Sequence, residues 1–201
     1  MNIDWYKVYT EKKKLSYNKK IFKKNLKIDR PYVALIKKYI GSKGKILECG
    51  CGPAKTAISI SNSGFEVTAI DHNKNILNLA KRNAKIAEVG IKFKLIDFFN
   101  IDKEFEKDFF GCITHQGVIE HFPKNEIKKI IRKQLKIVPF IIFSIPIDTK
   151  FNLIRYSQDN VYRNLWSKNR WVNDILKDFN VVETKIIGQR SDNLLVVIKR
   201  K

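Results

Sequence analysis

The chain has 201 residues and a mass of 23.5 kDa, which at about 150 residues per domain predicts one domain with a sizeable core. It carries 40 Lys and Arg against 20 Asp and Glu, a formal charge of +20, with 44% hydrophobic residues. That apolar content excludes a disordered polycation, because such chains cannot offset the entropy of ordering. No apolar run approaches the about 20 residues that span a bilayer, and the start lacks a secretory signal. We therefore expect a soluble cytoplasmic protein without a membrane span.

The positive charge has two interpretations. Lys greatly outnumbers Arg, and the chain is rich in Asn and Ile but poor in Ala and Met. An AT-rich coding sequence produces this skew whatever the function, and it predicts Lys on every exposed face. A nucleic-acid-binding protein instead concentrates its positive charge in one patch. Three cysteines, an odd number without zinc-site spacing, indicate buried thiols in a reducing compartment.

The predicted elements alternate between helix and strand. The lysine-rich first 30 residues predict one or two amphipathic helices outside the main core. Pro31 suits a first helical turn and Gly41 a helix end, so a helix is predicted between them. Apolar periodicity then predicts strands over 45–49, 65–70, 91–96, 109–114 and 139–144, and helices over 54–62, 75–87 and 124–136.

The last third of the chain breaks this rhythm. Residues 147–164 carry few strand or helix signals, and a helix is predicted over 167–178. Two closing strands, over 181–187 and 194–199, are separated by a short link that predicts an antiparallel hairpin. The expected fold is α/β: a seven-stranded, doubly wound, mostly parallel sheet with an antiparallel C-terminal hairpin and helices on both faces. Ligands in such sheets bind at the carboxyl ends of the strands.

A glycine-containing turn follows the first strand. The segment ILECGCGPA, residues 46–54, leaves an apolar strand and enters a helix, so Gly50 and Gly52 let the backbone pass close to a ligand. Nineteen residues after Gly52 the next strand ends in Asp71, which is placed to accept hydrogen bonds from a ribose diol. A dinucleotide-binding turn needs a small residue where Lys55 stands, and Glu48 would repel a pyrophosphate. The site therefore requires a ribose and a cation, and S-adenosylmethionine (SAM) offers both.

These motifs resemble those of class I SAM-dependent methyltransferases. ILECGCGPA is similar to motif I, VTAIDHN to motif II, THQGVIEHF to the "GVLEHF" segment after the fourth strand, and FSIP to the end of the fifth strand. The similarity covers about residues 43–200, and the subgroup it resembles acts on quinones, sugars, lipids and other small acceptors. The implied organisation is one domain, 1–201, with an N-terminal helical cap (1–42), a SAM-binding core (43–146), an acceptor-side insertion (147–171) and the C-terminal hairpin (172–201).

The resemblance also implies roles for individual residues. The turn residues, with Asp71 and His72, would hold the methionine and ribose parts of the cofactor. Asp97 and Phe98 would bracket the adenine, and His115 would approach the sulfonium. The implied cofactor-binding set is Glu48, Gly50, Cys51, Gly52, Asp71, His72, Asp97, Phe98 and His115. For Phe98, simple core packing remains an equal alternative.

Glu120 and His121 form the candidate catalytic pair. Some related enzymes bind a divalent metal through E-x-x-E-H in this segment, but Gly117 replaces the first of those acids, so no metal is expected. His121 suits the role of a general base on an acceptor hydroxyl. The alternative is a helix-entry pair that only stabilises the local backbone.

The acceptor side is predicted from the 147–171 insertion. Its length favours a functional segment, and its candidate substrate-binding residues are Arg155, Tyr156 and Tyr162. The favoured function is methyl transfer to oxygen or nitrogen of a small-molecule acceptor. One alternative is an RNA or DNA methyltransferase that uses the basic N-terminal region, although the N/D-P-P-Y motif of amino-directed base methylation is absent. A second is a non-catalytic SAM-binding partner subunit; the oligomeric state is not predicted.

Overall fold

The computed structural model describes residues 4–12, 17–157, 161–188, 190 and 192–201. Its strands form a seven-stranded mixed sheet in the order β3-β2-β1-β4-β5-β7-β6. Their bounds are β1 Lys45–Cys49, β2 Glu66–Asp71, β3 Ile91–Leu95, β4 Cys112–Gln116, β5 Phe140–Pro146, β6 Val181–Ile187 and β7 Asn193–Lys199. The predicted α/β fold, with parallel strands and an antiparallel C-terminal pair, is confirmed.

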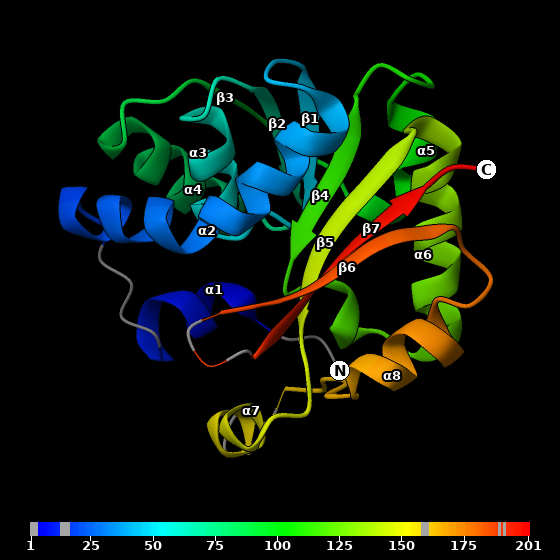
Figure 1. Ribbon diagram of the computed structural model, residues 1–201. Coiled ribbons are helices and arrows are strands. Elements are labelled where there is room, and N and C mark those ends of the chain that lie inside the picture. The colour runs from blue at the N-terminus through cyan, green and yellow to red at the C-terminus, as the bar shows by residue number, and fades with distance from the viewer. Residues whose placement is uncertain (1–3, 13–16, 158–160, 189, 191) are drawn as a thin grey trace. The chain divides into compact units, whose positions relative to one another are not determined.

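The chain divides into two compact units, Met1–Ile101 and Asp102–Lys201. In the first unit β2 pairs in parallel with both β1 and β3. Helices α2 (Lys19–Ile40), α3 (Lys55–Ser61) and α4 (Lys74–Ile86) pack beside these strands, and Figure 1 shows the three grouped together. The short segments α1 (Trp5–Lys7) and η1 (Val8–Lys12) precede them, and η2 (Phe98–Asn100) follows β3.

Helix α2 is much longer than predicted. It begins at Lys19, where the Asn18 side chain accepts a hydrogen bond from the Ile21 N–H at 2.9 Å, and it ends at Gly41, which has φ +85°. Pro31 therefore lies inside the helix and not in its first turn. An interior proline costs about 3 kcal/mol. Burial of the apolar side chains Tyr32, Val33, Leu35 and Ile36 on the same helix offsets this cost.

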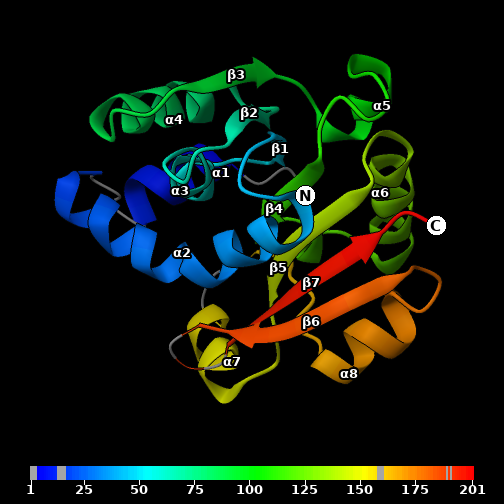
Figure 2. The same cartoon turned by 45° about the horizontal axis from the view of Figure 1, so that its top comes forward.

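In the second unit β4 and β5 pair in parallel, whereas β7 pairs antiparallel with both β5 and β6. Figure 2 shows this arrangement with β7 between β5 and β6. The predicted hairpin is confirmed. Helix α6 (Lys124–Ile137) buries Ile127, Ile130 and Ile131 and packs against β5, as its apolar stripe predicts. The short helices α5 (Ile101–Glu104), η3 (Ile119–His121), α8 (Lys168–Arg170) and η4 (Trp171–Ile175) complete the described elements around α7.

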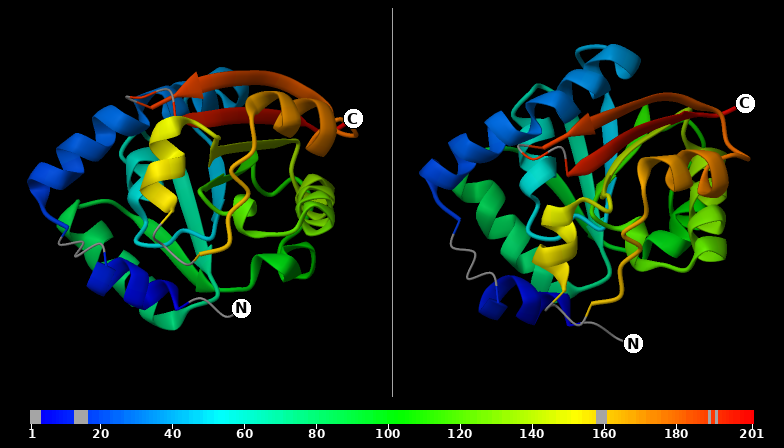
Figure 3. Two further views of the ribbon diagram at one scale, coloured as in Figure 1. Left: turned by 90° about the horizontal axis from the view of Figure 1, so that it is seen from below. Right: turned by 60° about the horizontal axis from the view of Figure 1, so that its bottom comes forward.

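Two expectations for the second unit are wrong in detail. Residues 150–156, assigned no structure from the sequence, form helix α7 (Lys150–Tyr156), which Thr149 caps by accepting a hydrogen bond from the Asn152 N–H. Figure 3 shows α7 as a separate yellow coil after β5. Strand β4 begins at Cys112 and not at residue 109, because Phe110 packs edge-on against Phe105 and Phe109 before the strand starts.

Candidate functional site

The turn after β1 has the backbone that the glycine pattern predicts. Gly50 and Gly52 have φ +65° and +52°, and Ala54 has φ +61° although it is not glycine. A side chain at the first two positions would be strained in this left-handed conformation. The turn is held from both ends: the Cys51 N–H donates to the Ile70 carbonyl at 3.0 Å, and the Asn83 side chain donates to the Pro53 carbonyl at 2.8 Å. These bonds fix the backbone of the turn at the end of β1.

Asp71 ties the turn to the end of β2. Its Oδ2 accepts the Gly52 N–H at 3.1 Å, and its Oδ1 accepts the Asn73 N–H at 3.0 Å. Burial raises the pKa of the Asp71 carboxyl, while these backbone donors act in the opposite direction. Each oxygen keeps a further lone pair for a ligand hydroxyl. The two motifs that the sequence predicts to bind one ligand are therefore in direct contact.

Glu48 lies beneath the same turn and is 3% exposed. Its Oε2 has no hydrogen-bond partner among the described residues. Burial, followed by the nearby Asp29 carboxylate, raises the pKa of Glu48 well above its ordinary value, and the Lys55 ammonium partly counteracts them. A buried carboxylate oxygen without a donor is costly unless a ligand satisfies it.

The remaining first-unit residues of the predicted cofactor set lie near the ends of β2 and β3. The His72 side chain is 58% exposed, with its Nδ1 3.6 Å from Asp71 Oδ1. Asp97 is exposed, and its Oδ1 accepts the Phe99 N–H at 2.9 Å, which starts η2. Phe98 stacks on Phe99 with ring centroids 4.7 Å apart. The Cys51 thiol is buried.

Tyr9, in η1, is a neighbour of the turn that sequence reasoning missed. A Cβ placed on Gly52 would lie 2.9 Å from the Tyr9 hydroxyl oxygen and 3.3 Å from its ring carbon Cζ. The tyrosine therefore covers the second glycine of the turn. The sequence spacing gives no sign of this contact, because the whole of helix α2 separates Tyr9 from the turn.

In the second unit, Glu120 occupies the segment that follows β4. Its side chain is 2% exposed, and its Oε2 has no hydrogen-bond partner within the described part of the chain. Burial raises the pKa of Glu120 to about 7, against the smaller opposing effect of Arg163. Its Oε1 would lie 3.4 Å from a Cβ on Gly117, so the carboxyl packs directly against that glycine. Gly117 stands where the metal motif has its first acid, and the Glu120 carboxyl lies in the space beside this glycine.

His121 is held in a defined orientation beside Glu120. Its Nδ1 lies 2.7 Å from the Tyr162 carbonyl oxygen. Since a carbonyl only accepts hydrogen bonds, Nδ1 carries the proton, and Nε2 lies 3.6 Å from Glu120 Oε1. Asn164 fixes the same loop: its N–H donates to the Glu120 carbonyl at 2.8 Å and its side chain to the Phe122 carbonyl at 2.6 Å.

His115 lies in the core. It is fully buried in β4 and stacks on Phe143 of β5 with ring centroids 4.9 Å apart. Burial lowers the pKa of His115 to about 3, so its ring is neutral at ordinary pH. The ring packs in the core, and its approach to the sulfonium stays a prediction.

The candidate substrate-binding residues cluster around α7. The Arg155 guanidinium lies 5.1 Å from the Tyr156 ring centroid, and that of Arg163 lies 3.8 Å from the same ring. Tyr162 is 52% exposed, and its hydroxyl donates to the Asn164 side chain at 2.9 Å. Tyr162 thus contacts His121 through the Tyr162 backbone carbonyl. The ring of Tyr156 contacts the guanidinium groups of Arg155 and Arg163.

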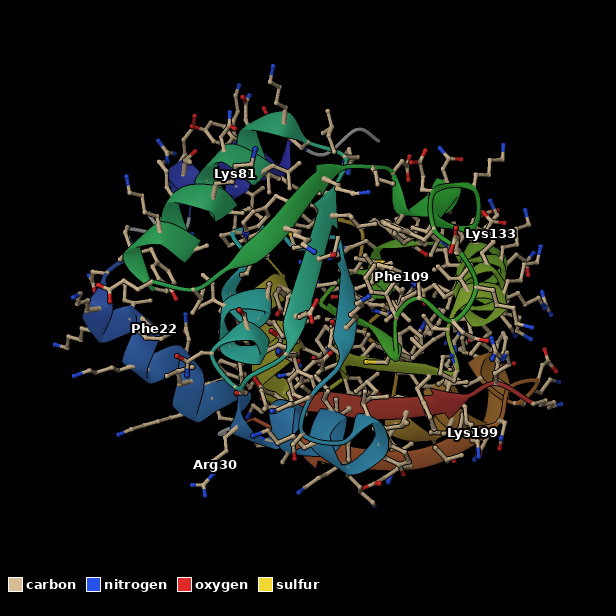
Figure 4. The ribbon with its side chains drawn as sticks, turned by 90° about the horizontal axis from the view of Figure 1, so that it is seen from above. Phe22, Arg30, Lys81, Phe109, Lys133 and Lys199 are labelled. Carbon is tan, nitrogen blue, oxygen red and sulfur yellow. The ribbon has the colours of Figure 1, made fainter. Side chains whose placement is uncertain are left out.

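The basic residues differ between the two long lysine-rich helices. On α6, Lys124 and Lys128 pair with Asp174 and Asp178, and Lys129 pairs with Glu126. On α2 the basic side chains Lys20, Lys23, Lys24, Lys27 and Arg30 are exposed, and Figure 4 shows Arg30 pointing away from the helix. Part of the positive charge is therefore neutralised within the second unit, which disfavours α6 as a phosphate-binding surface.

The described residues include neither a metal-binding cluster nor a membrane-spanning helix. No group of three or more His, Cys, Asp or Glu side chains there gathers closely enough to hold a metal ion. No helix there is both long enough and apolar enough to cross a membrane.

Comparison with known proteins finds a methyltransferase domain in part of the chain. Residues 46–138 match a family described as a methyltransferase domain. A ubiquinone biosynthesis O-methyltransferase of Coxiella burnetii is 28% identical over 89 residues, 44% of this chain and 37% of that protein. The chain thus matches little more than a third of the length of the first curated relatives.

Solved structures share the fold. The PH0226 protein from Pyrococcus horikoshii OT3 has a TM-score of 0.75 at 20% identity, with each chain covered in full. The magnesium protoporphyrin IX methyltransferase from Synechocystis PCC 6803, solved with bound SAH, has a TM-score of 0.68 at 16% identity, covering 88% of this chain and 83% of that one. The match over residues 46–138 identifies a methyltransferase domain in this part of the chain, and the sheet order and the hydrogen bond between the two motifs agree with the fold of the class I SAM-dependent methyltransferases.

Proposed function

We propose that the chain transfers the methyl group of SAM to an oxygen or nitrogen atom of a small-molecule acceptor. The observation that carries the proposal is the hydrogen bond between the Gly52 N–H and Asp71 Oδ2, 3.1 Å long, which joins the glycine turn to the ribose-binding acid. The similarity to a protein named as a ubiquinone biosynthesis O-methyltransferase supports a small acceptor. That the acceptor atom is oxygen or nitrogen is likewise proposed.

The residues present fit SAM. The unpartnered Glu48 Oε2 offers a buried negative group to an ammonium, and the left-handed Gly50 brings the turn backbone forward without a side chain. We assign Glu48, Gly50, Cys51 and Gly52 to the methionine part. Asp71 and His72 are assigned to the ribose, and Asp97 and Phe98 to the adenine. When bound, SAM supplies a methyl group that its sulfonium already activates.

We further propose that Glu120 and His121 manage the acceptor's proton. The Tyr162 carbonyl accepts the Nδ1–H and orients the His121 ring beside Glu120, which suits Nε2 to act as the base. As the acceptor oxygen or nitrogen forms its bond to the methyl carbon, its proton passes to Nε2, and the S–CH₃ electron pair stays on sulfur. The resulting imidazolium lies beside the Glu120 carboxylate, 3.6 Å away, which stabilises its charge. Arg155, Tyr156 and Tyr162 are proposed to align the acceptor.

Transfer of radiolabelled methyl from SAM into a fractionated cell extract tests the proposal. We expect label in the small-molecule fraction, and we expect His121→Ala to reduce it strongly while Lys81→Ala, an exposed change on α4, does not. Label in RNA or DNA would favour the nucleic-acid alternative. SAM binding without label in any fraction would favour a non-catalytic partner subunit.

A further inference from the structure

Arginines and aromatic rings form a cluster around α7 in the second unit. The Arg155 guanidinium lies 5.8 Å from the Phe151 ring centroid and 5.1 Å from that of Tyr156. Arg190, in the turn between β6 and β7, lies 4.1 Å from the Phe151 centroid. Arg163 lies 3.8 Å from the Tyr156 centroid. Each ring thus contacts two guanidinium groups, and Arg155 is common to both rings.

The buried side chain of Asn152 holds α7 against the turn that carries Arg190. Its amide donates to the Ile147 carbonyl at 2.8 Å and to the Asp192 carbonyl at 2.6 Å. The Ile147 N–H donates to the same Asp192 carbonyl at 3.2 Å. Figure 2 shows α7 beside this end of the β6–β7 hairpin. The two segments that supply the arginines are therefore fixed relative to each other.

The positive charge of this cluster is not neutralised by nearby acids. Arg155 and Arg190 are exposed, and neither forms an ion pair with a carboxylate of the described residues. Asp192, in the same turn as Arg190, is buried and accepts a hydrogen bond from the side chain of the next residue. By contrast, three lysines of α6 and the Arg200 side chain pair with carboxylates within the same unit. Concentrated charge without counter-charge favours an anionic ligand.

Stacking on the rings leaves the hydrogen-bond donors of these arginines usable. A guanidinium contacts an aromatic ring with its flat face, while its N–H groups point outward in its own plane. That edge matches two oxygens of a carboxylate or a phosphate. Because Arg155 and Arg190 lie 5.8 and 4.1 Å from one ring centroid, their Cζ atoms are at most about 10 Å apart. One anion between them is attracted by both charges.

We propose that Arg155 and Arg190 bind an anionic group of the acceptor, a carboxylate or a phosphate that is separate from the methylated atom. The inference rests on the proposed methyl transfer and gives the substrate class: the acceptor is an acid or a phosphate ester. Arg190 is then a specificity-determining residue supplied by the C-terminal hairpin. Both arginines lie outside residues 46–138, so this preference comes from a part of the chain that the methyltransferase-domain match does not cover.

Binding is tested on the full chain with three probes: phenyl phosphate, benzoate and the neutral benzamide. Nuclear magnetic resonance of the arginine Nε–H groups follows the titrations, and each signal is assigned by its loss in the Arg→Gln variant. We expect an anion to shift the Arg155 and Arg190 signals and benzamide to leave them in place. The anion that binds more tightly distinguishes a phosphate from a carboxylate.

Variants measure how much each arginine contributes. Arg155→Gln and Arg190→Gln should each weaken anion binding about fivefold, the upper end for an exposed ion pair. Arg132→Gln is the matched control, because Arg132 is also exposed and lies 5.8 Å from a ring centroid, that of Phe179, outside the cluster. It should leave the affinity unchanged. Unshifted backbone signals elsewhere show that each variant is folded.

The labelled product of the cell-extract assay tests the same inference during turnover. A product that keeps the anionic group is retained on an anion-exchange resin at neutral pH. We expect the label in this retained fraction, and we expect Arg190→Gln to reduce it about fivefold relative to the wild type and to Arg132→Gln.

Three results would overturn the inference and leave methyl transfer intact: anions that shift the Arg132 signal as much as those of Arg155 and Arg190, benzamide that binds as tightly as benzoate, or a labelled small molecule that passes the resin. The proposed function fails separately, if no fraction of the extract takes up label. The titrations require neither SAM nor turnover, so they still decide whether the cluster binds anions.

Discussion

Each of the two units of the chain holds a buried glutamate, Glu48 or Glu120, and the two glutamates differ in what surrounds them. Glu48, at the end of β1, faces an aspartate and a lysine that are themselves paired. Glu120, after β4, faces an imidazole whose other nitrogen is fixed by a backbone carbonyl. Each carboxyl keeps one oxygen without a described partner.

In the proposed function, this difference assigns Glu48 to cofactor binding and Glu120 to proton transfer. The aspartate and lysine beside Glu48 are paired with each other, and Glu48 Oε2 has no hydrogen-bond partner among the described residues, so the carboxyl suits the recognition of a cation. Burial brings the pKa of Glu120 to about 7, and its partner His121 carries an imidazole, a group that can take up a proton. A pair matched in this way suits the uptake and release of a proton. The predictions below act on one glutamate's region and leave the other unchanged.

The largest effect is expected at the glycine turn. Gly52→Val places a branched side chain at φ +52° and against the Tyr9 hydroxyl. Strain in this backbone region costs about 1–3 kcal/mol, and the clash adds to it, so SAM affinity should fall about 1000-fold by calorimetry. Gly90→Ala, where a Cβ meets nothing within 4 Å, is the matched control. Equal affinity of both variants would remove the turn from the site.

The next effect concerns turnover without binding. His121→Ala should lower kcat by about 100-fold, the range for loss of a general base, while the Kd for SAM stays within about twofold. Methyl-transfer kinetics and calorimetry on the same preparation measure the two quantities. A raised Kd with unchanged kcat would assign His121 to cofactor binding and contradict the separation.

Glu120 should also couple folding to pH. Its pKa rises from an ordinary 4.5 to about 7 in the folded chain, so the native state holds the proton more tightly than the unfolded state. Stability contributed by the protonated carboxyl is present below pH 4.5 and is lost as pH rises to about 7. The loss is about 3 kcal/mol in the free energy of unfolding.

Urea unfolding at pH 5 and pH 8 measures this dependence. Glu120→Gln, which does not ionise, should show a smaller loss between the two pH values than the wild type. Glu106→Gln, a change at an exposed position, should behave as the wild type does. His121 and Arg163 are the charged groups that face Glu120. A wild-type free energy of unfolding that rose between pH 5 and pH 8 would contradict the proposed environment of Glu120.

The smallest effect concerns the charge of Glu48. Because burial raises the Glu48 pKa in the empty site, SAM should bind more weakly at low pH, where the carboxyl is protonated, and affinity should rise with pH. Asp29 and Lys55 are the charged groups that face it, with the Cys49 and Cys51 thiols nearby. Glu48→Gln should lower SAM affinity about tenfold and remove this pH dependence. A pH profile unchanged by the substitution would show that another group titrates.

The sequence predicts what depends on neighbouring residues along the chain. The turn of residues 50–54 follows from glycine spacing after an apolar strand, and the C-terminal hairpin follows from its short link. Helix α7 was missed because it has no apolar stripe: its buried residue is Asn152, which donates to the Ile147 and Asp192 carbonyls. The beginning of α2 was missed because Pro31 resembles a helix start, although burial further along the helix outweighs its cost.

The sequence does not predict contacts between segments that are distant along the chain. Lys55 was noted only as a residue that breaks a dinucleotide fingerprint, because its partner Asp29 lies on another helix. The orientation of His121 depends on the Tyr162 carbonyl, and the cover over Gly52 on Tyr9. Residue type suggested these side chains, but packing across the chain decides which of them meet.

Calorimetric titration of the full chain with SAM tests the central claim most directly. The account predicts that one SAM binds per chain, that Asp71→Ala abolishes the binding by removing the carboxylate joined to Gly52, and that Lys81→Ala retains it. Absence of SAM binding by the wild-type chain, or equal binding by Asp71→Ala, would contradict it.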